Sequence, residues 1–167
     1  MELASMLSRC AALEARVAAL YRSWAAGARD RPELCALWTR LARDEEEHAR
    51  SLTEAQSDLP AVEGWRTQVT GWEEAVRGAD DALAAAERLS GAGADVQLGA
   101  ALDLESTELE ALRALLLVVS HHGASIRPPQ GHALAVAEAA ERHSRDPHVL
   151  LQAALLRARA RIEPPSS

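Results

Sequence analysis

Apolar residues recur along most of this 167-residue chain at alternating steps of three and four, a spacing that predicts amphipathic α-helices. Glycine, proline and aspartate interrupt this pattern and set the expected boundaries. The expected helices lie at residues 2–27, about 30–56, 65–76, 79–89, 95–120, about 132–145 and 146–162. The two pieces between residues 65 and 89 carry the weakest pattern. The chain is therefore predicted to be all-α.

The long helices form two hairpins, residues 2–56 and 95–145, separated by a crossover at residues 57–94. A connection of about 38 residues can return along the whole length of a bundle, so the second and third long helices are expected to run parallel. We expect one four-helix-bundle domain over residues 1–163. Its last helix, residues 146–162, is amphipathic, which predicts packing on the bundle or contact with a second copy in a homodimer.

Composition supports the helical interpretation and narrows the choice of partners. The chain contains 36 Ala and 24 Leu, whereas aromatic residues make up 3% of it, which nearly excludes an all-β domain. A net charge of −7 disfavours nucleic acid, because phosphate binding needs a basic surface. The longest apolar run, Leu115–Val119, is far shorter than the ~18 residues of a membrane helix. The first ten residues lack the pattern of a secretory signal, so we expect a cytoplasmic protein without membrane contact.

Polar residues interrupt the apolar stripe of each long helix. They are Glu14 in the first helix, Glu45 and His48 in the second, Glu105 in the third and His143 in the fourth. An isolated buried carboxylate costs several kcal/mol unless it is paired or bound to a metal, so three of them need a common explanation. A cation in the core of the bundle supplies one.

The spacing of these residues supports a shared site. If the first turn is centred between residues 29 and 30, Glu14 and Glu45 each lie about 15 residues from it and therefore at the same height in the bundle. Glu-x-x-His places Glu45 and His48 on one face of a helix, one turn apart. The alternative is that the whole acidic run, residues 44–47, is a solvated helix face. We expect Asp44, Glu46 and Glu47 to lie on a solvated face, and Glu45 to point into the core.

The stretch of residues 37–49, Leu-Trp-Thr-Arg-Leu-Ala-Arg-Asp-Glu-Glu-Glu-His-Ala, resembles the second helix of the rubrerythrin branch of the ferritin-like superfamily. Glu14 followed by Tyr21 is similar to the first helix of that branch, in which a tyrosine lies close to the metal centre. Glu105 followed by Glu108 is similar to its third helix, which carries one ligand and a second carboxylate that can exchange onto the metal. The resemblance implies a ferritin-like four-helix bundle that holds iron, as a di-iron centre with peroxidase or ferroxidase chemistry.

The implied ligands are Glu14, Glu45, His48, Glu105 and His143, with Glu108 as an exchangeable carboxylate and Tyr21 near the centre. The fourth helix departs from the family, because Ala140 stands three residues before His143 where the family has a glutamate. Four further histidines, expected in loops or at helix starts, need no functional account; they are His121, His122, His132 and His148.

The two cysteines, Cys10 and Cys35, form no Cys-x-x-Cys pair and are expected to be reduced thiols. The rubredoxin-like part that delivers electrons in classical rubrerythrins is therefore not expected, and a redox reaction would need a separate electron-donor protein. Two alternatives stay open. One is a degenerate bundle that acts as an interaction or scaffold protein, and the other is a mononuclear site of Glu14, Glu45 and His48 that holds zinc or manganese.

Overall fold

A computed structural model describes the backbone of residues 3–58, 71–120 and 130–160, and the side chains of residues 4–57, 71–107 and 131–160. Within these ranges the chain forms six helices and no strand. They are α1 (Leu3–Gly27), α2 (Pro32–Asp58), α3 (Trp72–Glu87), α4 (Ala94–Ser120), α5 (Gln130–His143) and α6 (Pro147–Ala160). The all-α prediction is confirmed, and the long helices lie close to their expected boundaries.

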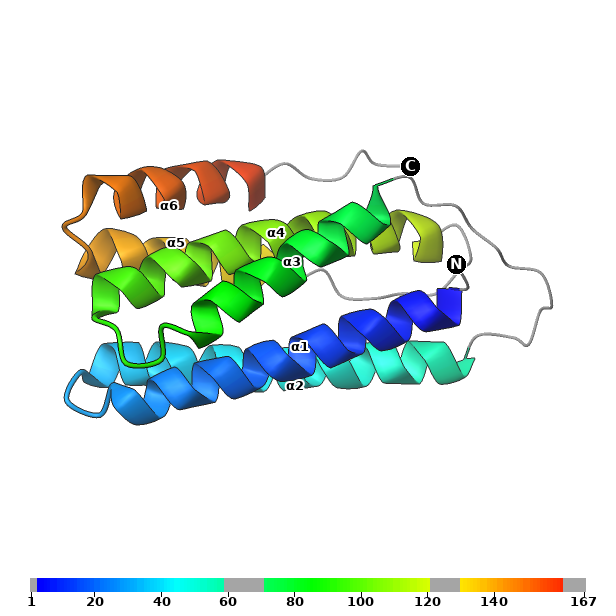
Figure 1. Ribbon diagram of the computed structural model, residues 1–167, viewed down its shortest axis with the longest axis horizontal. Coiled ribbons are helices and arrows are strands. Elements are labelled where there is room, and N and C mark those ends of the chain that lie inside the picture. Colours follow the sequence, from blue (N-terminus) through cyan, green and yellow to red (C-terminus); the bar gives the residue numbers. More distant parts are fainter. Residues whose placement is uncertain (1–2, 59–70, 121–129, 161–167) are drawn as a thin grey trace.

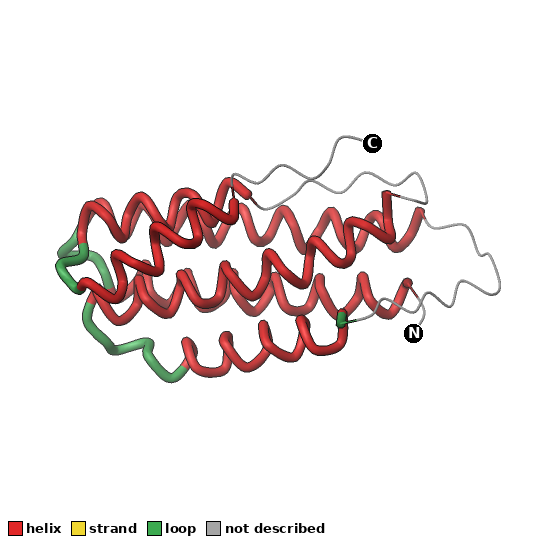
Figure 2. Tube along the Cα trace, turned by 90° about the horizontal axis from the view of Figure 1, so that it is seen from above, coloured by secondary structure: helices red, strands yellow, loops and turns green. Residues whose placement is uncertain are grey.

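The helices run roughly along the long axis of the molecule (Figures 1 and 2). Helices α1 and α2 form a tight antiparallel hairpin. Helices α4 and α5 contact one another and lie beside this hairpin. Helix α3 lies on one outer face of the bundle, where it contacts α4 and α1, whereas α6 packs on the outer side of α4 and α5 (Figures 1 and 2). The core between these layers consists mainly of Ala, Leu and Val.

The described part of the crossover, from residue 71 onward, holds one continuous helix that passes through Gly78, near which the sequence predicted a break between two weaker pieces. Helix α3 begins after Gly71, whose φ of 84° lies in the left-handed region that glycine adopts without strain. It then passes through Gly78 and buries Val76 and Leu83 on either side of it. A glycine inside a helix costs about 1 kcal/mol, which the burial of one such side chain offsets.

Ion pairs and one cation–π contact fix α3 on α1. The guanidinium of Arg16 lies 3.0 Å from Asp80 and 3.2 Å from Glu87, and Arg9 lies over the ring of Trp72 at 5.4 Å. Trp72 itself is buried within the chain. The other tryptophan expected in the crossover, residue 65, lies outside the described residues.

The start of α6 follows its sequence prediction. The carboxylate of Asp146 accepts a hydrogen bond from the backbone N–H of His148 at 2.8 Å, and Pro147 occupies the first helical position. Val149 and Leu156 face the bundle and are buried. Both cysteines are free thiols, as predicted. Among the described residues, no helix is long and apolar enough to cross a membrane.

Replacing Leu83 by Ala tests whether the crossover helix belongs to the cooperative core. Leu83 is fully buried, so its truncation removes apolar burial and leaves a cavity, and we expect a loss of about 2–5 kcal/mol in the free energy of unfolding. The measurement is urea denaturation followed by circular dichroism. The matched control is Leu155→Ala, at a position that is 56% exposed, with an expected loss below about 0.5 kcal/mol. Equal losses in the two variants would contradict the packing described.

Candidate metal centre

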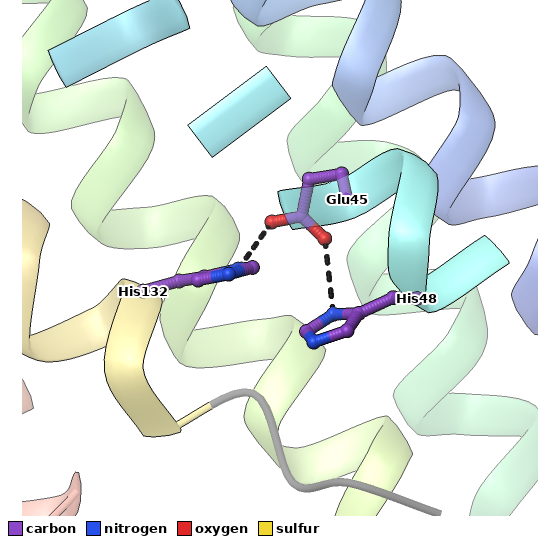
Figure 3. Close-up of side chains that lie close together, drawn as sticks. All are labelled: Glu45, His48 and His132. Carbon is purple, nitrogen blue, oxygen red and sulfur yellow. Dashed lines mark hydrogen bonds and ion pairs between the residues drawn. The ribbon is translucent and has the colours of Figure 1, made fainter. Parts of the chain in front are cut away.

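The carboxylate of Glu45 lies between two imidazole rings. His132 Nδ1 is 2.6 Å from Glu45 Oε1, and His48 Nδ1 is 3.4 Å from Glu45 Oε2 (Figure 3). The rings of His48 and His132 stack on one another with centroids 4.7 Å apart and planes inclined by 21°. One ligand atom from each of these three residues lies within 4.8 Å of the other two.

Helical periodicity brings these groups together. Glu45 and His48 are three residues apart on α2 and therefore share one face, whereas His132 comes from the first turn of α5. On the outer side of the His132 ring, Nε2 lies 3.5 Å from the carboxylate of Asp44. A carboxylate on the second nitrogen of a histidine fixes the orientation of its ring, as it does beside many metal sites.

Two further buried carboxylates surround this group. Glu14 on α1 is 1% exposed and places Oε2 3.6 Å from His48 Nδ1. Glu105 on α4 is also 1% exposed, and its Oε1 accepts a hydrogen bond of 2.8 Å from the hydroxyl of Tyr21. Helices α1, α2, α4 and α5 thus all contribute to one polar cluster inside an apolar core.

Several oxygens of the cluster lack a hydrogen-bond donor. Neither carboxylate oxygen of Glu14 accepts a hydrogen bond with good geometry from the described residues, and the same holds for Oε2 of Glu45. These atoms are buried, so in the absence of a cation or a proton each would carry a desolvation cost of about 1–3 kcal/mol or more. The cluster therefore has unused capacity to bind a positive charge.

The protonation of the cluster follows from burial and from its own contacts. Burial raises the pKa of Glu14 well above its ordinary value, and the neighbouring Glu45 adds to that rise. Burial also acts to raise the pKa of Glu45, but contacts with Glu14, His132 and His48 outweigh it and hold that pKa below its usual range. Glu45 therefore carries the negative charge of this pair of carboxylates.

The negative charge of Glu45 also shifts the pKa values of the two histidines and of Glu105. Burial alone would lower the pKa of His48, but its contacts with Glu14 and Glu45 raise it to about 10. Glu45 likewise raises the pKa of His132 against the effect of burial. Burial, with the repulsion of Glu45, raises the pKa of Glu105 to about 7. Without a metal, the cluster is thus held together by protons that a metal ion would displace.

The structure brings together most of the residues singled out by the sequence. Glu14, Glu45, His48 and Glu105 meet in the core, and Tyr21 contacts Glu105. The side chain of Glu108 lies outside the described residues.

His143 is the exception, because it does not reach the cluster. Its Nε2 lies 3.1 Å from Glu33 Oε2, where α5 ends and α2 begins, and Ala140 is buried in the core one turn before it. The absence of a carboxylate at residue 140 therefore does not affect the cluster.

The structure places His132 where the sequence predicted His143. Sequence reasoning treated His132 as a helix-start residue, although the signal was present. Extending the fourth stripe backwards from Val136 by one step of four reaches His132. Asp44 also differs from its prediction as a purely solvated acid, since its side chain is 34% exposed and contacts His132.

Comparison with protein-family models, with curated proteins and with solved structures finds no match for this chain. The interpretation of the cluster therefore depends on its geometry and chemistry.

Replacing Glu105 by Gln tests the electrostatics of the cluster. Because the pKa of Glu105 is raised from 4.5 to about 7, the folded protein holds a proton that the unfolded chain releases between these values. This stabilisation is complete below pH 4.5 and is lost as the pH rises through 7, by about 3 kcal/mol. Gln keeps an acceptor for Tyr21 and has no proton to lose.

We therefore expect wild-type protein in chelator to lose more stability than Glu105→Gln between pH 5 and pH 8. Urea denaturation at four pH values within this interval measures the difference. Parallel stability curves for the two proteins would show that Glu105 is already ionised at pH 5.

Proposed function

We propose that this protein binds iron inside its helical bundle, with Glu45, His48 and His132 as the central ligands and Glu14 and Glu105 as further carboxylate ligands. The observation that carries the proposal is the position of the Glu45 carboxylate, buried between two imidazoles and beside two more buried carboxylates. Glu45 and His48 from one helix and His132 from another thus offer one ion an oxygen and two nitrogen ligands.

The donor set suits a first-row transition metal. Carboxylate oxygen and imidazole nitrogen together favour iron, manganese or zinc over the all-oxygen sites of magnesium and calcium. Two such ligands on one ion lie at most about 4.2 Å apart, twice a bond of about 2.1 Å. The three ligand atoms lie within 4.8 Å of one another, which is close to the ~4.2 Å that one ion allows. Modest rotations of the side chains would therefore bring them around a single ion.

The arrangement of ligands among the helices supports a ferritin-like, rubrerythrin-like assignment. Ferritin-like di-metal bundles take one Glu from each of two helices and Glu-x-x-His from each of the other two. Here α1 and α4 each offer one Glu, α2 offers Glu45 with His48, and α5 offers His132. Residue 129, three positions before His132, is a proline, so the last carboxylate of that set is missing from α5.

A di-iron centre would need a fourth carboxylate, and the family resemblance implies Glu108 for that role. Glu108 lies one turn after Glu105 on α4, and with it the chain would offer four carboxylates and two histidines, the number that two metal ions need. A centre of two irons therefore requires Glu108, whereas a single ion does not.

Bound iron would supply one-electron redox chemistry toward peroxide or dioxygen. The chain's own residues set the conditions for it. Tyr21 holds Glu105 by a hydrogen bond, Asp44 and Glu45 contact the two nitrogens of His132, and all three glutamates are buried. A separate protein would have to deliver electrons to this centre.

The alternative is a scaffold bundle without a metal. The same cluster also supports a scaffold, because the positive charges of protonated His48 and His132 balance the negative charge of Glu45. A protonated Glu14 can donate its proton to a neighbouring oxygen. In that case the polar cluster would serve only to fix how the helices pack.

Iron analysis of His132→Ala and His143→Ala variants separates these functions and tests the assignment of the fourth-helix ligand. After anaerobic loading with ferrous iron and desalting, we expect one to two irons per wild-type chain, a similar content in His143→Ala, and at least a tenfold weaker retention in His132→Ala. Glu108→Gln should lower a content of two to about one. A wild-type content below about 0.2 iron per chain would exclude the iron-binding function and favour the scaffold.

A further inference from the structure

The buried cluster can be reached from solvent past its two histidines. The three glutamates are 0–1% exposed, whereas the side chains of His48 and His132 are 14% and 8% exposed. Both imidazoles line a cleft of about 590 Å³ between α2 and α5. Among the described residues, anything that enters the cluster by this cleft passes over the two imidazole rings.

Apart from the two histidines, most of the charged side chains that line this cleft are acidic. Asp44 and Glu47 of α2 and Glu138 of α5 contribute three carboxylates, against the single guanidinium of Arg40. Glu47 and Glu138 are exposed, and neither is needed for the contacts that hold the cluster together. Carboxylates at the mouth of the cleft attract a cation toward the two imidazoles, behind which the buried carboxylate oxygens lie.

We propose that this cleft is the entry route for divalent metal ions, and that Glu47 and Glu138 attract the ion electrostatically before it meets His48 and His132. The inference rests on the proposed metal-binding function and adds the route and the residues that control the rate. Two features point to a cation rather than an anion: the acidic lining, and the oxygens of Glu14 and Glu45 that accept no hydrogen bond at the inner end.

Asp44 has two roles in this route. Its carboxylate lies 3.5 Å from His132 Nε2 and is 34% exposed, so it joins the mouth of the cleft to the cluster. It is a positioning residue for His132 as well as part of the acidic lining. For that reason the test of the entry route leaves Asp44 unchanged.

The experiment measures the association rate of Co²⁺ with the full chain by stopped-flow absorption, for wild type and for a Glu47→Gln/Glu138→Gln variant. At about 10 mM ionic strength, where charges act over about 30 Å, we expect the variant to bind Co²⁺ about threefold to tenfold more slowly. At about 1 M salt, where screening is nearly complete, the two rates should agree within about twofold. The amount of Co²⁺ bound at saturation should be unchanged.

The matched control is Glu74→Gln/Asp81→Asn, which removes the same charge from exposed positions on α3, a helix that among the described helices contacts α1 and α4 and not α2 or α5. We expect wild-type kinetics from this control. An equal slowing in both double variants, or none in the cleft variant, would overturn the entry route while leaving metal binding intact. A wild-type protein that takes up no Co²⁺ at any salt concentration would overturn the proposed function itself.

Discussion

The structure depends on how one buried negative charge is balanced. Glu45 lies at the centre of a core made almost wholly of alanine, leucine and valine, where an isolated carboxylate would be strongly unfavourable. Imidazoles from two different helices balance it, and that requirement fixes the rotation of α2 and the position of the first turn of α5. Glu14 contacts His48 beside this centre, and Glu105 accepts a hydrogen bond from Tyr21.

The many alanines in the core determine how closely the helices around this centre approach one another. Small side chains let four helices approach closely enough for residues on α1, α2, α4 and α5 to share one cluster. The larger side chains gather beside it, where Tyr21 stacks on Trp38 at 5.6 Å and Trp24 meets Trp38 at 5.1 Å. An aromatic wall next to the hydrogen bond between Tyr21 and Glu105 excludes water from one side, and the cleft between α2 and α5 admits it from another.

Local patterns in the sequence were sufficient to predict much of this arrangement. Glu14 and Glu45 were predicted to lie at the same height in the bundle, because their helices are joined by one short turn and each residue is about 15 positions from it. His132 was missed because the height of α5 relative to α2 depends on the connection between α4 and α5, which helical periodicity does not determine. Gly78 was expected to interrupt a helix, and burial of the neighbouring side chains outweighed its weak propensity.

The most direct test of the proposed metal site is anomalous diffraction at the iron absorption edge, from crystals of protein loaded with ferrous iron without oxygen. The account predicts an anomalous peak bounded by Glu45, His48 and His132, with each ligand atom about 2.0–2.3 Å from it. A second peak about 3.5–4 Å away would mark a di-iron centre. An empty cluster in iron-loaded crystals, or iron bound beside His143 instead, would contradict the account.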